Sequence, residues 1–216
     1  EITIRRDLNQ LAADGLLYRT HGGAKKVDPL QVPHDFMNKA AKNVEEKDKI
    51  CRAAAKEIND GDIIFMDCGS AVFRLCQFIK SKRIKVITNS LPVIYELQNS
   101  LVSLNIIGGE FNTERQAVHG KIADEHIARY RATKAFLGVD GVSRNGLFAN
   151  SELEADITQA FAANSAKTYL LCDNSKIGKE TYLNFGKLNM INSIITNSKS
   201  DEFAYFKKQG VEVICV

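Results

Sequence analysis

The sequence predicts an α/β protein built on a mostly parallel, doubly wound sheet, preceded by a short basic leader. From Asp62 to the end of the chain, apolar runs alternate with amphipathic helical segments. This alternation is typical of right-handed βαβ units, which place strands parallel and cover both faces of the sheet. Neither G-x-G-x-x-G nor G-x-x-x-x-G-K-S/T occurs, which argues against a dinucleotide-binding fold and a P-loop.

The composition is that of an ordinary globular chain. Of its 216 residues, 44% are hydrophobic and 25% charged, which suits one large domain, alone or with a small appendage. A net charge of +3 is too small to indicate nucleic-acid binding on its own. The five cysteines are odd in number and lack a C-x-x-C pair, which favours reduced thiols and argues against a metal site. No apolar run approaches the roughly 18 residues of a membrane span. We therefore expect a cytoplasmic protein without cofactor, metal or membrane partner.

The leader, residues 1–26, carries five Lys/Arg against three Asp/Glu, a net charge of +2. A helix is expected from Thr3 to Asp14, ended by Gly15, with Ile4 and Leu8 on one face and arginines on the other. A strand over 16–21 and a turn at Gly22-Gly23 follow. A polar, Arg-bearing helix and a hairpin suit the C-terminal half of a winged helix-turn-helix. The alternative is a solvated amphipathic helix.

The stretch 27–36 contains Pro29 and Pro33 without a clear period, and is expected to link the leader to a body over 37–216. The body begins with a helix over 39–59. The opening strand then ends in Asp67-Cys68-Gly69-Ser70, followed by a helix carrying Val72 and Leu75 inward. Free N–H groups at such a helix start favour an anion, although an ordinary turn with Ser70 as N-cap is the alternative.

Six further strands and four further helices complete the expected body. The strands are expected over 84–88, 104–107, 134–139, 168–172, 193–196 and 211–215, and the helices over 91–98, 121–130, 152–164 and 201–209.

Small and polar residues follow five of these strands. Besides 67–70, the endings are Thr88-Asn89-Ser90, Gly108-Gly109-Glu110, Asp140-Gly141 and Asp173-Asn174-Ser175-Lys176. The carboxyl ends of parallel strands lie at one edge of a sheet, where ligands bind. The five endings are therefore expected to line one pocket, with donors for a phosphate, oxygens for hydroxyl groups, and Lys176 as a cation.

Several of these segments resemble one protein family. Thr3-Ile4-Arg5-Arg6-Asp7-Leu8-Asn9-Gln10-Leu11, with His21-Gly22-Gly23-Ala24 a dozen residues on, resembles the recognition helix and wing of DeoR-type bacterial transcription regulators. The segments 86–92, 107–110, 135–143 and 173–179 are similar to that family's C-terminal sensor domain. The resemblance implies a fold like ribose-5-phosphate isomerase and a phosphorylated sugar as effector.

The strand endings, the leader and the resemblance together indicate which residues bind each partner. Effector binding is expected at Asp67, Cys68, Gly69, Ser70, Asn89, Ser90, Gly109, Glu110, Asp140, Gly141, Glu152 and Lys176. Double-stranded operator DNA is expected to contact Thr3, Arg5, Arg6, Gln10, Arg19, His21, Lys25 and Lys26. The sequence departs from the family at Ala71, where a second Thr is common, and at Cys68 and His119.

The resulting interpretation is a sugar-phosphate-responsive repressor of a carbohydrate operon, acting as a homodimer or homotetramer because palindromic operators mirror a two-fold protein. Two alternatives stay open. One is a sugar-phosphate isomerase using Asp67, Glu110 or Asp140 as acid or base, for which the leader would have no use. The other is an interaction module without a ligand.

Overall fold

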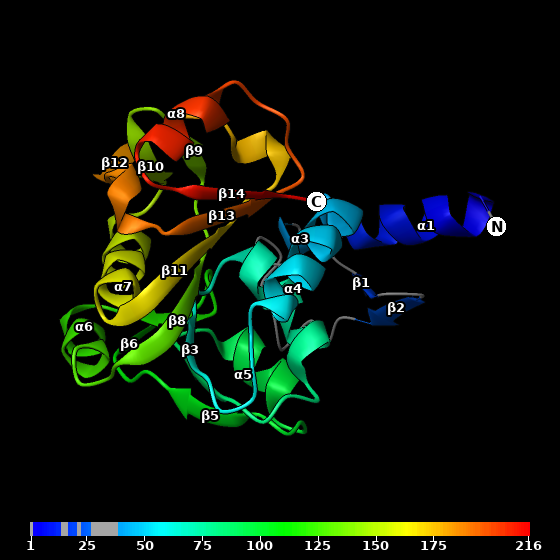
Figure 1. Ribbon diagram of the computed structural model, residues 1–216. Helices are drawn as coiled ribbons and strands as arrows, with labels where there is room; N and C mark the ends of the chain where they lie inside the picture. Colours follow the sequence, from blue (N-terminus) through cyan, green and yellow to red (C-terminus); the bar gives the residue numbers. More distant parts are fainter. Residues whose placement is uncertain (1, 14–16, 21–22, 27–38) are drawn as a thin grey trace.

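A seven-stranded parallel sheet forms the centre of the protein. The computed structural model describes residues 2–13, 17–20, 23–26 and 39–216. The strand order is β14-β13-β11-β8-β3-β4-β5, and every neighbouring pair is parallel (Figure 1). The strands are β3 (Ile63–Met66), β4 (Lys85–Thr88), β5 (Ser103–Ile106), β8 (Ala132–Leu137), β11 (Ser165–Leu171), β13 (Ser193–Thr196) and β14 (Glu212–Cys215). The predicted doubly wound α/β sheet is confirmed.

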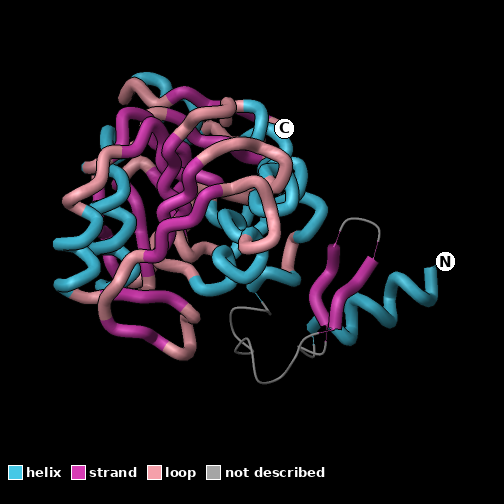
Figure 2. Tube along the Cα trace, turned by 90° about the horizontal axis from the view of Figure 1, so that it is seen from below, coloured by secondary structure: helices cyan, strands magenta, loops and turns pink. Residues whose placement is uncertain are grey.

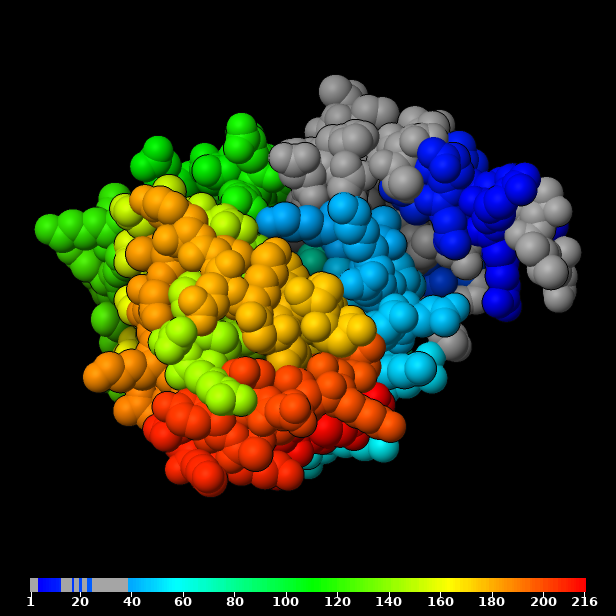
Figure 3. All heavy atoms as spheres, turned by 90° about the horizontal axis from the view of Figure 1, so that it is seen from above, coloured from blue at the N-terminus to red at the C-terminus, as the bar shows by residue number. Residues whose placement is uncertain are grey.

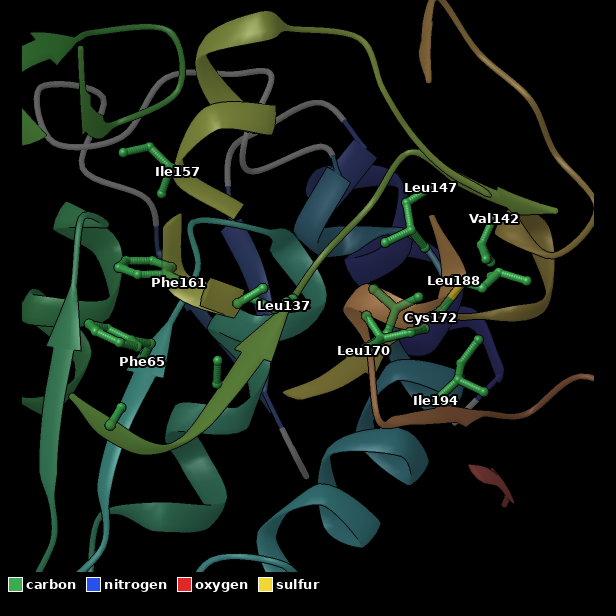
Figure 4. Packing of buried hydrophobic residues seen from close by; sticks show 14 of the residues in the cluster. Phe65, Leu137, Val142, Leu147, Ile157, Phe161, Leu170, Cys172, Leu188 and Ile194 are labelled. Atoms are coloured by element: carbon green, nitrogen blue, oxygen red, sulfur yellow. The ribbon is translucent and has the colours of Figure 1, made fainter. Parts of the chain in front are cut away.

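Successive residues of each central strand enter two different cores. In β3, Ile64 and Met66 belong to one cluster and Phe65 to the other, because side chains alternate across a strand. The first cluster is covered by α3 (Val44–Lys56), α4 (Ser70–Ile79) and α5 (Leu91–Leu97), and the second by α6 (Lys121–Ile127), α7 (Glu152–Ala163) and α8 (Glu202–Lys208). Figure 4 shows the second cluster, where the rings of Phe65 and Phe161 stack with centroids 4.6 Å apart.

Two antiparallel additions were not predicted. β9 (Gly141–Ser143), β10 (Gly146–Ala149) and β12 (Leu183–Gly186) form a three-stranded sheet in the order β12-β10-β9. β6 (Glu110–Asn112) and β7 (Ala117–His119) form a hairpin directly after β5. These strands have only three or four residues, too few for a period to show in the sequence.

The helix expected over 39–59 is interrupted. Residues 39–41 are helical, but Asn43 adopts a left-handed conformation with φ 53°, and α3 starts at Val44. Asparagine tolerates this conformation better than most residues. Around this interruption, Lys39, Lys42 and Asn43 line a cavity at the carboxyl ends of the strands, described below.

A buried ion pair joins α3 to α4. The Arg74 guanidinium donates to both carboxylate oxygens of Asp48, from Nε at 2.6 Å and from an Nη atom at 2.9 Å. The Gln77 side-chain amide also donates to Asp48, at 2.8 Å. Both charged side chains are buried, so each depends on the other to offset its lost hydration.

In the leader, α1 spans Ile2–Ala13, and the strands β1 (Leu17–Thr20) and β2 (Gly23–Lys26) pair antiparallel, as the sequence predicted (Figure 2). The expected inner face of α1 is only partly covered: Ala12 is buried and Leu8 half-buried, whereas Ile4 is 64% exposed and Leu11 38%. Gly15, His21, Gly22 and the expected linker 27–36 lie outside the described residues. Among the helices described, none combines the length and apolarity needed to cross a bilayer.

Candidate functional site

A cavity of about 520 Å³ lies where β3, β8 and β11 end, and is called the strand-end cavity here. Of the twelve residues expected at the effector site, six line it: Asp67, Cys68, Gly69, Ser70, Asp140 and Lys176. In the space-filling view of Figure 3, the start of α3 (light blue) meets the segment after β11 (gold). Residues of both segments line the cavity.

One corner of the cavity gathers hydrogen-bond donors and a positive charge. Gly69, not Ser70, is the N-cap of α4, and the Ser70 side chain makes no capping bond. Its hydroxyl oxygen instead accepts a hydrogen bond from Lys47 Nζ at 3.3 Å. The first N–H groups of a helix have no partner within the helix, and the dipole makes this end positive. The corner therefore combines backbone donors, a hydroxyl group and an ammonium group.

Lys47 is the cation of this corner, and sequence reasoning missed it. It lies in α3, is only 5% exposed, and also donates to the carbonyl oxygen of Lys39 at 2.5 Å. Burial lowers the pKa of Lys47 to about 8, although the negative charge of Asp173 opposes the shift. Because Lys47 precedes the sheet in the sequence, no strand ending pointed to it.

Asp67 holds the loops of the site in place. Its carboxylate accepts hydrogen bonds from the backbone N–H of Cys68 at 2.6 Å and of Gly138 at 3.0 Å, and from the Thr158 hydroxyl at 3.2 Å. These contacts tie together the loop after β3, the loop after β8 and helix α7. Burial raises the pKa of Asp67 even though the backbone and hydroxyl donors favour the ionised form.

Asp140 brings two lysines together on another wall. Its Oδ1 atom lies 3.8 Å from Lys39 Nζ and 3.8 Å from Lys176 Nζ. Lys176 lies in a short 3-10 helix (Asn174–Lys176) after β11, whose start is fixed by Asp173 accepting from the backbone N–H of Ser175 at 2.9 Å.

A second ion pair joins the β6–β7 hairpin to α7 at the cavity. An Nη atom of Arg115 lies 3.2 Å from Glu154 Oε1. Burial raises the pKa of Glu154, and the charge of Arg115 opposes this. Glu154 and Thr158 both line the cavity. Their i, i+4 spacing places them on one face of a helix, and this pattern could have been recognised in the sequence. These residues give the cavity carboxylate and hydroxyl groups opposite its lysines.

Five strand endings were expected to line one cavity, and the structure shows that three of them do. Asn89 and Ser90, after β4, are fully buried and are not among the cavity's lining residues. The Asn89 side-chain amide donates to the carbonyl oxygen of Val118 at 3.0 Å, and its main chain accepts from the Val118 N–H at 2.8 Å. Ser90 bridges to Ala117. This ending therefore holds the β6–β7 hairpin against the sheet.

Two glycines expected at the site have a steric role instead. A side chain at Gly141 would collide with the carbonyl oxygen of Lys179, so the glycine allows β9 to approach that segment. Gly109 has φ +151°, and a Cβ atom there would lie 2.8 Å from the His119 carbonyl oxygen. Neither glycine lines the cavity.

Two acidic residues expected at the site also lie elsewhere. Glu152 is exposed at the start of α7, with its Oε1 atom 3.5 Å from the Tyr182 hydroxyl, which donates to it. Glu110 lines a separate, smaller pocket beside the hairpin. The additional cavity residues that sequence reasoning missed include Lys39, Lys42, Asn43, Lys47, Glu114, Arg115, Glu154 and Thr158.

The residues expected to contact DNA are only partly described. Arg5, Arg6 and Gln10 lie on the exposed part of α1, and Arg6 Nε is 3.9 Å from Asp7 Oδ1. The backbone of Thr3 lies in α1, that of Arg19 in β1, and those of Lys25 and Lys26 in β2, while His21 lies outside the described residues. Among the residues that the structure describes, no three His, Cys, Asp or Glu side chains converge to hold a metal ion.

A charged cavity at the strand ends of an α/β body, joined in sequence to a basic helix and hairpin, defines a two-part protein with a ligand-sensing and a DNA-binding region. Residues 42–198 match the DeoR C-terminal sensor domain, and residues 1–29 match the DeoR-like helix-turn-helix domain. The chain belongs to the DeoR family of transcription regulators.

The chain is similar to named repressors over almost its whole length. It is 33% identical over 218 residues to the lactose phosphotransferase system repressor of Streptococcus mutans serotype c, covering 99% of this chain and 87% of that protein. It is 31% identical to the repressor of the same name from Staphylococcus aureus (strain N315), with the same two coverages of 99% and 87%. These relatives are repressors, and the chain is a regulator rather than an enzyme.

Solved structures of low sequence identity share the fold. The translation initiation factor eIF-2B of Pyrococcus horikoshii OT3 matches with a TM-score of 0.53 at 19% identity, over 75% of this chain and 68% of that one. Ribose 5-phosphate isomerase A of Methanocaldococcus jannaschii matches with a TM-score of 0.46 at 19% identity, over 63% of this chain and 55% of that one. The likeness to the initiation factor supports the α/β fold alone.

Proposed function

We propose that the protein represses a carbohydrate-utilisation operon and responds to a phosphorylated sugar bound in the strand-end cavity. One observation carries this proposal: the start of α4, the Ser70 hydroxyl and the Lys47 ammonium group converge at one corner of the cavity. A helix N-terminus with a cation beside it is a ready anion site. The names of the repressors from Streptococcus and Staphylococcus point to the same class of operon.

The remaining walls suit the sugar part of such a ligand. Asp140 and Glu154 supply carboxylate oxygens, and Thr158 supplies a hydroxyl group, all able to bond sugar hydroxyl groups. The volume of about 520 Å³ falls within the range of small-molecule sites, roughly 300–1,000 Å³. Lys176, held 3.8 Å from Asp140, supplies a second cation for the phosphate.

The cavity wall offers a route from ligand to leader. Lys39, Lys42 and Asn43 line the cavity and directly follow residues 27–38, through which the chain connects to the DNA-binding leader. Lys47 donates both to the Lys39 carbonyl and to Ser70. A phosphate at Ser70 competes for that ammonium group and so weakens its hold on Lys39. Because only differential affinity shifts an equilibrium, the effector then favours one arrangement of the connecting segment.

On DNA, the leader would supply mostly phosphate contacts. Arg5, Arg6, Lys25 and Lys26 suit the backbone, while Thr3, Arg6 and Gln10 are placed by the sequence to reach base edges. Each phosphate neutralised releases counterions, so operator affinity falls steeply with salt. A two-fold oligomer acting in the cytoplasm fits a palindromic operator.

The test is fluorescence anisotropy of the whole protein on labelled DNA from upstream of its own gene, with and without a panel of hexose and disaccharide phosphates. We expect specific binding that one sugar phosphate changes and that the unphosphorylated form of the same sugar does not. Absence of specific binding, or binding that no sugar phosphate alters, would overturn the proposal. Ser70→Ala tests the corner directly, since it should weaken the sugar-phosphate response without altering operator affinity.

A further inference from the structure

A second pocket, of about 340 Å³, lies beside the β6–β7 hairpin and is called the hairpin pocket here. Its lining residues are Glu110 to Glu114, His119 and Leu153. The function proposed above uses none of them, although Glu114 also lines the strand-end cavity.

His119, the last residue of β7, is the unusual group in this pocket. Its side chain is only 2% exposed, yet among the described residues neither ring nitrogen has a hydrogen-bond partner of acceptable geometry. Burial lowers the pKa of His119, and the Ala117 backbone opposes this shift, so the site favours the neutral ring. Leaving a buried polar group unsatisfied destabilises the protein. A ligand that both accepts and donates hydrogen bonds would remove that cost.

The charge of the hairpin pocket differs from that of the strand-end cavity. Glu110 and Glu114 are acidic, and no lysine or arginine lines the pocket among the residues that the structure describes. A phosphate would therefore meet two carboxylates without a cation to offset them, which disfavours any phosphorylated ligand. The pocket requires a neutral or cationic occupant.

The polar groups fit hydroxyl groups best. A neutral imidazole offers one donor and one acceptor, as a hydroxyl group does, while carboxylates accept and the Asn112 amide can do both. Phe111 and Leu153, exposed by 43% and 45%, add apolar surface on which the C–H face of a sugar ring can pack. No three metal-ligating side chains converge among the described residues, which leaves a bare metal ion without a ligand set.

We propose that the hairpin pocket is a second binding site, for an unphosphorylated saccharide, with His119 and Glu110 as its hydrogen-bonding residues. It differs from the proposed effector site in location, in charge and in the ligand it takes. Because Glu114 lines both pockets, a saccharide bound here lies next to the hairpin that carries Arg115 to the strand-end cavity. The proposal does not depend on operator binding or on the phosphosugar response.

The test is ligand-observed NMR titration of the whole protein with glucose, galactose and lactose, and with glucosamine and glucose 6-phosphate for comparison. Two variants address the pocket. His119→Phe keeps a buried ring but removes both nitrogens, and Glu110→Gln changes an exposed side chain and leaves the fold unaffected. Lys176→Ala in the strand-end cavity is the matched control.

We expect at least one neutral saccharide to bind saturably, with affinity reduced about tenfold or more, equivalent to 1.4 kcal/mol, by each pocket variant and unchanged by Lys176→Ala. The proposal is overturned if neither a neutral saccharide nor glucosamine binds, or if Lys176→Ala abolishes saccharide binding while Glu110→Gln does not. Failure of the effector proposal would appear separately, as an absent response to glucose 6-phosphate and the other sugar phosphates.

Discussion

The carboxyl ends of the sheet fall into two groups with similar sequences and different uses. The loops after β3, β8 and β11 open into the strand-end cavity, with Ser70, Asp140 and Lys176 among its lining residues. The loop after β5 leads instead into the β6–β7 hairpin, and the loop after β4 contacts that hairpin through the Asn89 side-chain amide, which donates to the Val118 carbonyl oxygen. Small polar residues at a strand end therefore either line an open cavity or bond the backbone, and only the folded structure shows which.

The largest expected effect is a loss of stability when the buried ion pair between Asp48 and Arg74, which joins α3 to α4, is broken. Asp48→Ala leaves the Arg74 guanidinium buried beside an empty site, and removing one partner of a buried pair costs about 3–5 kcal/mol. Chemical denaturation should show this loss. The matched control is the double replacement Asp48→Leu with Arg74→Met, which removes both charges and should recover most of the stability. A single variant as stable as the native protein would contradict the interpretation of this contact.

The next largest effect is the pH dependence of anion affinity at the cavity corner formed by Ser70 and Lys47. The pKa of Lys47 is about 8, so this side chain loses its proton as the pH rises from 7 to 9. A phosphate ester has its second pKa near about 6 and stays fully ionised over that interval. An anion bound at this corner therefore loses a cationic partner, and its affinity should fall by as much as about tenfold.

Isothermal titration across that pH range measures this effect. Lys47→Met should bind weakly at every pH, with a flat profile above pH 7. A native affinity that stayed constant or rose from pH 7 to pH 9 would exclude Lys47 as an anion ligand.

The smallest effect distinguishes the strand ending that holds the β6–β7 hairpin from those that line the strand-end cavity. Asn89→Ala removes the amide that donates to Val118, and a net loss of about 1 kcal/mol in unfolding free energy is expected. Effector affinity should be unchanged, because Asn89 does not line the cavity. Ser70→Ala is expected to do the opposite, weakening effector affinity with little change in stability. If Asn89→Ala abolished effector binding in a folded protein, the division between the two groups would be wrong.

The sequence predicted the seven strands because apolar runs alternate with amphipathic helical segments along the body, and Ile63–Met66 and Ser193–Thr196 are two of these runs. It predicted Ser70 and Lys176 at the cavity because parallel strands end at one edge. Lys47 could not be predicted in this way, because it lies in α3, before the first strand of the sheet, and contacts Ser70 only in the folded protein. Asn89 and Gly141 were misplaced because their composition matches that of binding loops, whereas their hydrogen bonds and close contacts appear only in three dimensions.

The central claim, that the strand-end cavity binds a sugar phosphate, is tested most directly by unfolding the protein in the presence of candidate ligands. A ligand at a hundred times its dissociation constant should add about 2.7 kcal/mol to the native protein. The same ligand should add far less to Lys176→Ala and the full amount to Glu110→Gln, whose site lies in the hairpin pocket. An equal gain in the native protein and Lys176→Ala, or no gain from any sugar phosphate, would contradict the account.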